Sequence, residues 1–126
     1  MEVNSTLLNK IQAELAAAQR ILIVSHIRPD GDAVGSLLGL GLSLLATGKH
    51  VQMVLSDGVP ANFHFLAGVG QIRKKPEGDF DYRIVVDASE MKRVGRAFDD
   101  QPIPDLNVDH HITNECFARH NLVLSD

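Results

Sequence analysis

Residues 21–36, with the sequence ILIVSHIRPDGDAVGS, decide the fold. The run from Ile21 to Ser25 is short, apolar and rich in β-branched side chains, which is typical of a parallel strand buried on both faces. Pro29 and Gly31 then force a sharp turn. A helix rich in Leu, Ala and Gly is expected over residues 32–47, and its near-continuous apolarity predicts that it is buried. The stretch therefore predicts a strand, a tight turn and a buried helix in succession.

The segments on either side extend this unit into an alternating α/β pattern. Apolar residues recur at helical spacing from Leu7 to Ala18, and Asn4 or Ser5 can cap that helix. Short apolar runs downstream predict three more strands and a terminal or edge strand, at residues 51–55, 83–86, 105–108 and 117–124. Residues 62–66 are expected to form a short helix, and residues 71–81 an exposed connection without a functional role. We therefore predict a doubly wound, mostly parallel sheet with helices on both faces, joined by right-handed crossovers.

Composition and charge limit the class of protein. The chain has 126 residues, of which 44% are hydrophobic and 22% are charged, so we expect one soluble domain with one core. No apolar stretch is long enough for a membrane helix, and the first residues lack the pattern of a secretory signal. The single cysteine, Cys116, excludes a disulfide framework and is expected to be a small buried residue. A net charge of −4 provides no broad basic surface for a long nucleic acid, and we expect a cytoplasmic protein.

Residue types that bind metals follow three of the predicted strands. In a sheet of this kind ligands lie beyond the carboxyl ends of the strands, so these positions are the candidates for a site. They are His26, Asp30 and Asp32 after the first strand, Asp87 after the third, and Asp109, His110 and His111 after the fourth. All are oxygen or imidazole donors with no thiolate among them, which favours Mn²⁺ or Mg²⁺ over a structural zinc ion.

Each of these groups has a plainer interpretation when it is considered alone. Asp30 and Asp32 could cap a helix in a solvated turn, and Asp87 could simply begin a turn. The expected convergence of all the groups at one edge of the sheet favours a site instead. Three other histidines have no such partners in the sequence and are expected to be surface or packed residues, namely His50, His64 and His120.

Three segments resemble, in order, the first three motifs of the DHH phosphoesterases, a family that includes RecJ-like exonucleases and the oligoribonuclease/PAP phosphatases. They are HIRPDGDAVGS at residues 26–36, VVD at residues 85–87, and DHH at residues 109–111, the triplet that gives the family its name. The resemblance covers nearly the whole chain. It implies a doubly wound parallel sheet, in agreement with the pattern of strands and helices.

The resemblance also implies a centre that binds two divalent cations, with Mn²⁺ expected and Mg²⁺ as the other candidate. His26 and Asp30 would hold one ion, Asp32 and His110 would hold the other, and Asp87 would bridge the two. Such a pair of ions can activate a water molecule and stabilise the oxygens of a phosphoryl displacement.

Other residues of the resemblance would act on the substrate. The bridging aspartate, His110 and His111 are the expected catalytic residues, with His111 close to the substrate phosphate or the leaving group. Asp109 would orient the histidines from behind them. Arg28 and Ser36 are the further candidates for substrate binding, although Arg28 could equally face solvent.

The pattern of the family continues beyond what these 126 residues contain. Its members contribute a fourth metal-binding aspartate and a C-terminal substrate-binding domain with a glycine-rich segment, and neither is found in this sequence. We therefore expect residues 1–126 to form an incomplete N-terminal DHH metal-binding domain. An exposed sheet edge and uncovered apolar surface would favour a homodimer.

The expected reaction is hydrolysis of phosphoester bonds in short oligonucleotides, cyclic dinucleotides or 3′-phosphoadenosine phosphate (PAP). Two alternatives stay open on the sequence. One is an inorganic pyrophosphatase of the family-II type, and the other is a non-catalytic module that binds a metal or a nucleotide without turnover.

Overall fold

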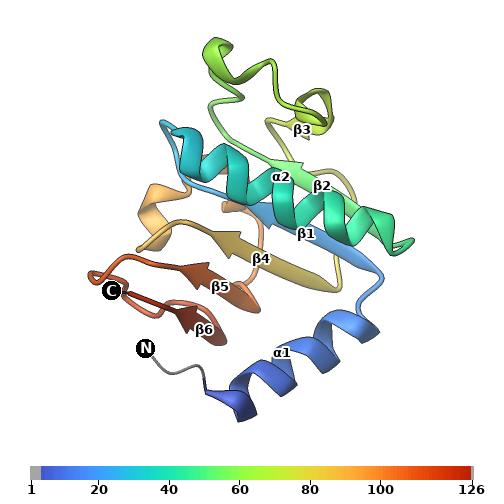
Figure 1. The fold of residues 1–126 in the computed structure, drawn as a ribbon, viewed down its shortest axis with the longest axis vertical. Coiled ribbons are helices and arrows are strands. Elements are labelled where there is room, and N and C mark those ends of the chain that lie inside the picture. Colours follow the sequence, from blue (N-terminus) through green and yellow to red (C-terminus); the bar gives the residue numbers. More distant parts are fainter. Residues whose placement is uncertain (1–3, 126) are drawn as a thin grey trace.

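The computed structural model describes residues 4–125, which form one six-stranded sheet with the strand order β3-β2-β1-β4-β5-β6 (Figure 1). Every strand pair in these residues is parallel. The strands are β1 (Arg20–Val24), β2 (His50–Val54), β3 (Ile72–Arg73), β4 (Tyr82–Val86), β5 (Leu106–Asp109) and β6 (His120–Val123). The predicted α/β fold around a parallel sheet is confirmed, and each predicted strand coincides with an observed one.

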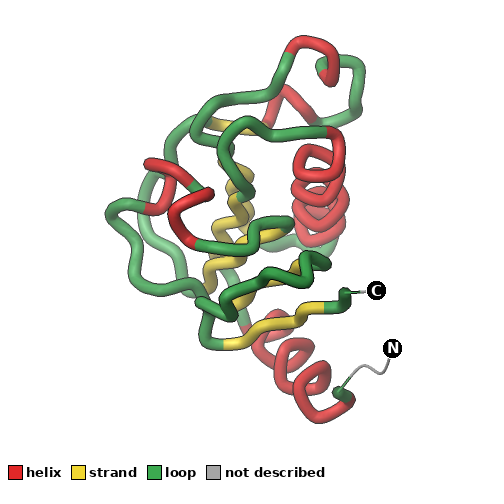
Figure 2. Tube along the Cα trace, turned by 90° about the vertical axis from the view of Figure 1, so that its left-hand side faces the viewer, coloured by secondary structure: helices red, strands yellow, loops and turns green. Residues whose placement is uncertain are grey.

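Both α-helices, α1 (Ser5–Ala17) and α2 (Gly31–Ala46), lie on the same face of the sheet (Figure 2). Their apolar side chains join those of the strands in one core cluster, with Ile11 contributed by α1 and Leu37 by α2. Asn4 caps α1 as expected, because its side chain accepts hydrogen bonds from two backbone N–H groups of the first turn. One face of the sheet is therefore covered by regular helices.

The opposite face of the sheet is covered by two short 3₁₀ turns, η3 (Met91–Arg93) and η4 (Gly95–Phe98). Val94 and Phe98 are buried there against strand residues such as Val85. Helical segments thus lie on both faces, as predicted, but those on the second face are single turns. Their brevity matters for the site, because η3 and η4 follow directly on the loop after β4.

Helix α2 packs into the core as expected, but it is fully buried along one side only. Ala33, Leu37 and Gly41 are buried, whereas Gly39 and Ser43 are exposed. Leucines beside the buried stripe, such as Leu40 and Leu44, are partly buried and pack against the same core, and small residues occupy the exposed positions. Within residues 4–125 no helix has the length and apolarity that a membrane span needs.

Three connections differ from the sequence-based expectation. The short helix expected at residues 62–66 is a 3₁₀ turn, η1 (Ala61–Phe63), which is followed by η2 (Val69–Gln71). The exposed connection expected at residues 71–81 includes β3, a two-residue edge strand that pairs with β2. Cys116 is exposed and not buried, because it lies in a loop whose backbone enters the left-handed region there, with a φ of 53°.

The strand order creates a switch point between β1 and β4. The chain runs outward from β1 through β2 to β3 and then returns to β4 on the other side of β1. Ser25, directly after β1, joins the two strands across this point, since its hydroxyl donates to the carbonyl of Val86 at 2.7 Å. Ligand crevices in parallel sheets open at such a switch point, beyond the carboxyl ends of the strands.

Candidate metal centre

The loop after β1 brings three predicted ligands to the carboxyl edge of the sheet. His26 is buried, and its Nδ1 lies 2.7 Å from the carbonyl oxygen of Ile27. Because a carbonyl oxygen can only accept, Nδ1 carries the proton and Nε2 is left as the nitrogen that can bind a metal. Asp30 caps α2, and the N–H of Ala33 donates to its Oδ1 at 2.9 Å, which lowers the pKa of Asp30. Asp32 lies exposed in the first turn of α2.

Asp87 lies between two histidines at the end of β4. Its Oδ2 is 3.5 Å from Nε2 of His26, and its Oδ1 is 2.9 Å from Nε2 of His110. The backbone of Asp87 is in the left-handed region, with a φ of 58°, and its N–H donates to the carbonyl of Val108 at 2.9 Å. Non-glycine residues in this region are uncommon and concentrate at functional sites. The turn aims one carboxylate oxygen at each histidine.

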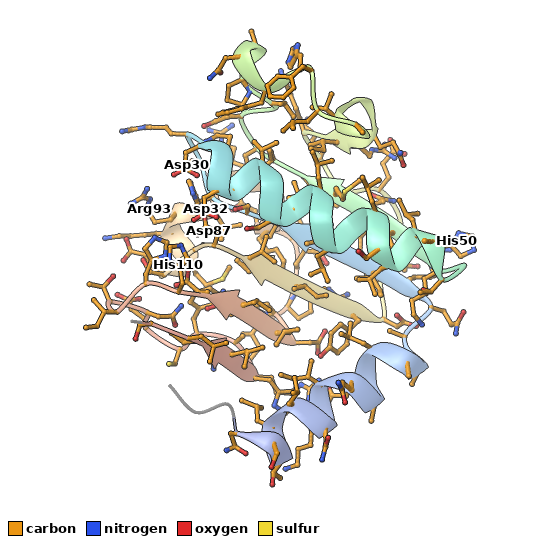
Figure 3. The ribbon with its side chains drawn as sticks, in the orientation of Figure 1. Asp30, Asp32, His50, Asp87, Arg93 and His110 are labelled. Atoms are coloured by element: carbon orange, nitrogen blue, oxygen red, sulfur yellow. The ribbon has the colours of Figure 1, made fainter. Side chains whose placement is uncertain are left out.

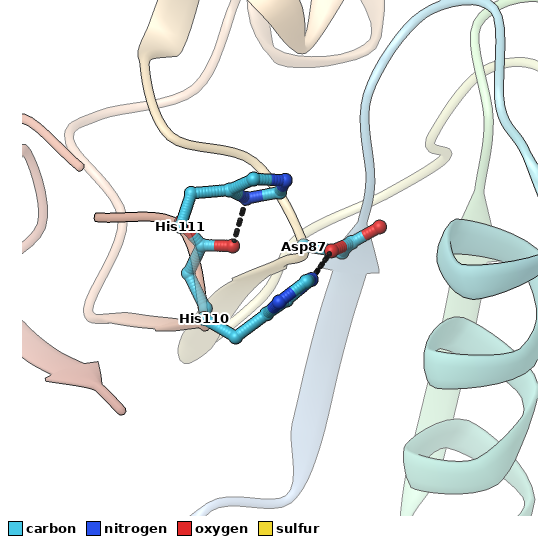
Figure 4. Close-up of side chains that lie close together, drawn as sticks. Asp87, His110 and His111 are labelled. Carbon is cyan, nitrogen blue, oxygen red and sulfur yellow. Dashed lines mark hydrogen bonds and ion pairs between the residues drawn. The ribbon is translucent and has the colours of Figure 1, made fainter. Parts of the chain in front are cut away.

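The histidines of the DHH triplet face two different groups of acceptors. His110 Nε2 lies 2.9 Å from Oδ1 of Asp87 (Figure 4). The same nitrogen lies 2.9 Å from Oδ2 of Asp32. His111 turns the other way, and its Nδ1 lies 2.6 Å from Oδ1 of Asp109. The two imidazole rings are 4.4 Å apart between centroids. His110 therefore joins α2 to β4, and His111 is held from behind by Asp109.

The charges at this edge are mutually unfavourable without a cation. Burial raises the pKa of Asp87, and the nearby Asp32 carboxylate raises it further. Although some desolvation opposes it, the hydrogen bond from His110 to Asp87 and the carboxylates around it raise the pKa of His110. The carboxylates around His110 thus favour a positive charge at this position.

The donor groups fit two cations that share one carboxylate. The possible ligand atoms form two sets. Within each set all atoms lie within 4.8 Å of one another, and Asp87 belongs to both sets. One set is His26, Asp30 and Asp87, and the other is Asp87, Asp109, His110 and His111. In the second set the Asp109 carboxylate is already occupied by His111 and Asn114, at 2.6 and 2.7 Å. Asp32, whose Oδ2 lies 2.9 Å from Nε2 of His110, is a further donor beside this set and is otherwise exposed.

Of the predicted site residues, seven come together and two do not. Asp30, Asp32, Asp87 and His110 lie together at one end of the sheet in Figure 3, and the distances above join His26, Asp109 and His111 to them. By contrast, Arg28 is exposed, and its N–H donates to Oδ2 of Asp57 at 2.7 Å. Ser36 is half-buried in α2. Within residues 4–125, neither side chain forms a hydrogen bond or ion pair with the cluster.

The remaining histidines lie where the sequence predicted, away from the cluster. His50 is exposed at the opposite end of α2 (Figure 3). His64 contacts the carbonyl of Val59 at 2.9 Å, and His120 contacts Oε2 of Glu14 at 2.9 Å. None of the three is a ligand candidate.

Two kinds of residue near the cluster were missed from the sequence. Arg93 lies at the same end of the sheet (Figure 3), and its carbonyl accepts from the N–H of Ile27 at 2.6 Å. The feature of the sequence that could have indicated Arg93 is the basic pair at residues 92–93, downstream of the strand that ends at Asp87. Asn107 and Asn114 lie behind the triplet. The signal for Asn107 was a polar residue within an otherwise apolar strand.

The model of the protein family described as "DHH family, N-terminal domain" matches residues 20–125. The chain belongs to the DHH family. It is 34% identical over 109 residues to the bifunctional oligoribonuclease and PAP phosphatase NrnA of Thermus thermophilus, an alignment that covers 82% of this chain and 31% of that protein. This DHH chain therefore spans about a third of the length of the curated relative it matches.

A solved structure supports the fold of this DHH domain. An exopolyphosphatase-related protein from Bacteroides fragilis matches with a TM-score of 0.83 over 96% of this chain and 39% of that chain. The sequence identity is 23%, so this likeness bears on the fold alone. It agrees with the six-stranded parallel sheet described above.

Proposed function

We propose that this DHH domain is the metal-binding, catalytic part of a phosphoesterase that hydrolyses short oligonucleotides, cyclic dinucleotides or PAP. The observation that carries the proposal is the position of Asp87, with one carboxylate oxygen facing His26 and the other facing His110. A carboxylate that faces an imidazole on each side can bridge two divalent ions, which together stabilise a phosphoryl displacement. The substrates are proposed because the T. thermophilus relative is an oligoribonuclease and PAP phosphatase.

The contacts support one assignment of ligands to each ion. His26 and Asp30 would hold one ion, Asp32 and His110 the other, and Asp87 both. All donors are carboxylate oxygens or imidazole nitrogens, which suits Mn²⁺ or Mg²⁺, and we propose Mn²⁺ because imidazole is a poor ligand for Mg²⁺. When bound, such ions lower the pKa of a coordinated water and neutralise charge on phosphate oxygens.

The chain itself supplies orientation and a proton site. The Nδ1–H of His111 donates a hydrogen bond to Asp109. The other ring nitrogen, Nε2, can therefore exchange a proton with a substrate oxygen. The Asp109 carboxylate is buried, but hydrogen bonds from Asn114 and His111 outweigh that burial and keep its pKa below the usual value. Asp109 therefore stays ionised and fixes the tautomer of His111.

The test is hydrolysis by the complete protein with Mn²⁺, using an RNA dinucleotide, PAP and inorganic pyrophosphate in separate assays. We expect turnover of the dinucleotide or PAP, and loss of that turnover with a chelator. Turnover of pyrophosphate alone would support a pyrophosphatase instead. Calorimetric binding of Mn²⁺ without turnover of any substrate would support a non-catalytic binding module.

A matched pair of histidine variants tests the assignment of the site. We expect His110→Ala to lower both Mn²⁺ affinity and turnover by about a hundredfold or more, because loss of an outer-shell partner alone typically costs about ten- to a hundredfold. His50→Ala removes an exposed histidine at the far end of α2 and should leave both quantities unchanged. Equal effects of the two variants would contradict the proposed centre. The homodimer and the cytoplasmic location stay predictions.

A further inference from the structure

A fully buried asparagine lies in the sheet directly behind the candidate metal centre. Asn107 of β5 is 0% exposed. Its Nδ2 donates to the carbonyl of Val85 at 3.0 Å and to that of Ala88 at 3.3 Å. A polar amide within a parallel strand is costly unless its hydrogen bonds are made, and here β4 and the turn that follows it supply the acceptors. The side chain therefore ties β5 to the turn that contains Asp87.

A second asparagine connects this anchor to the DHH triplet. The Nδ2 of Asn114 lies 2.7 Å from Oδ1 of Asn107 and 2.7 Å from Oδ2 of Asp109, and 3.4 Å from the carbonyl of Ala88. Its Oδ1 accepts from the N–H of Cys116 at 2.6 Å, which holds that residue in its left-handed conformation. One amide group thus contacts both loops that carry the bridging aspartate and the triplet.

The contacts of Asn114 constrain two groups of the centre. The Asp109 carboxylate cannot rotate, since one oxygen is taken by His111 and the other by Asn114. The left-handed turn at Asp87 is held on both sides. Its own N–H donates to the carbonyl of Val108, and the carbonyl of the next residue, Ala88, accepts from Asn107, which Asn114 holds in turn. Unfavourable backbone conformations persist only when their surroundings determine them in this way.

We propose that Asn114 is a positioning residue that aligns the bridging carboxylate of Asp87 and the imidazole of His111 through a single amide group, with Asn107 as its buried anchor. The inference rests on the proposed function, because it concerns the alignment of that same centre. It assigns to Asn114 no contact with metal or substrate. Loss of the amide should leave every ligand present but misaligned.

The test compares Asn114→Ala with Asn121→Ala in the complete protein. Asn121 is a matched control, because it is also half-buried and also makes local hydrogen bonds, to the N–H and carbonyl of Ala118 at 3.0 and 2.8 Å. For Asn114→Ala we expect Mn²⁺ affinity to fall by about tenfold and kcat on PAP or an RNA dinucleotide by about ten- to a hundredfold, with KM nearly unchanged. Asn121→Ala should change none of these.

Imidazole NMR on the metal-free protein provides a readout that does not depend on activity. The wild type should show a slowly exchanging Nδ1 proton on His111, held by Asp109, and Asn114→Ala should lose it while Asn121→Ala keeps it. If Asn114→Ala does not fold, Asn114→Ser, which keeps a short hydroxyl donor, takes its place. An unchanged His111 signal with unchanged Mn²⁺ affinity in the folded variant would overturn the inference.

The same measurements separate this inference from the proposed function. If the wild type neither binds Mn²⁺ nor hydrolyses a substrate, the proposed function fails whatever the variant does. If the wild type does both and Asn114→Ala behaves as Asn121→Ala does, only the positioning role fails. A selective loss of kcat, with KM kept and the His111 signal lost, supports both.

Discussion

Replacing Asp87 by asparagine should stabilise the metal-free protein and remove its response to Mn²⁺. Asp87 is 4% exposed and lies close to the Asp32 carboxylate, so its ionised form is unfavourable in the absence of a cation. Asparagine has nearly the same shape and tolerates a positive φ. Its carbonyl can accept from His110, and its amide can donate to Nε2 of His26, whose other nitrogen carries the proton. Asp87→Asn therefore keeps both contacts and removes the charge.

The size of the effect follows from the geometry around His110. Carboxylate oxygens of Asp32 and Asp87 both lie 2.9 Å from the same nitrogen, so they are no more than twice that distance apart. Two charges so placed repel by about 3 kcal/mol at an effective dielectric constant of about 20. The Asp32 side chain is 56% exposed, and solvent therefore screens much of this energy. Lost attraction to His110 offsets another part, which leaves a net gain of about 1–2 kcal/mol, or a rise in Tm of about 3–8 °C.

Thermal unfolding with a chelator, and then with Mn²⁺, measures this effect. At a hundred times its Kd, an ion stabilises the wild type by about 2.7 kcal/mol, whereas Asp87→Asn should gain little, so the order of the two Tm values should reverse. The pKa of Asp87 is raised in the folded wild type above its ordinary value of 3.8. The wild type therefore keeps its full stability below pH 3.8, where Asp87 is protonated, and loses part of it as the pH rises through the folded-state pKa. The advantage of the variant in chelator should thus shrink from pH 7 towards pH 4. A variant less stable than the wild type in chelator at pH 7 would refute the reasoning.

Two further predictions concern stability away from the centre. A hydrogen bond from Arg119 lowers the pKa of Glu14 to about 2, so Glu14→Gln should cost about 1–2 kcal/mol at pH 7, and this difference should disappear as the pH falls from about 4.5 towards 2, as urea unfolding would show. If the cost stayed constant over that range, the ion pair would not be its source. In α2, a Cβ on Gly41 would lie 2.2 Å from Sδ of Met53, whereas a Cβ on Gly39 would meet nothing within 4 Å. Thermal melts should therefore show Gly41→Ala destabilised by about 1–3 kcal/mol and Gly39→Ala stabilised by about 0.5–1 kcal/mol, and similar shifts for both would contradict this packing.

The parts of the fold that could be predicted are those with strong local signals. Strands β1 and β4 are short runs dominated by β-branched and aliphatic residues, and β2 and β5 carry such residues at alternate positions. The convergence of His26, Asp87 and the triplet could be predicted because parallel strands end at one edge of a sheet. That argument depends on topology alone and needs no side-chain detail.

What the sequence did not predict depends on tertiary contacts. The 3₁₀ turns over residues 91–98 mix charged residues with Gly95, and only Val94, Ala97 and Phe98 bury their side chains, too few for a recognisable period. The left-handed backbone of Asp87 has no local signature, because it is held by Val108 from another strand. The exposed side of α2 did not stand out in the sequence because exposed residues need not be polar, and Gly39 is one of them.

The switch point between β1 and β4 also has a kinetic consequence. His26, Asp30 and Asp32 lie on one side of it, whereas Asp87 and His110 lie on the other, so no complete coordination shell exists until both halves of the sheet have docked. Long-range parallel pairing is a slow step in folding, and an ion that binds only after it cannot accelerate it. A cation bound there should therefore slow unfolding of the chain and leave its folding rate unchanged.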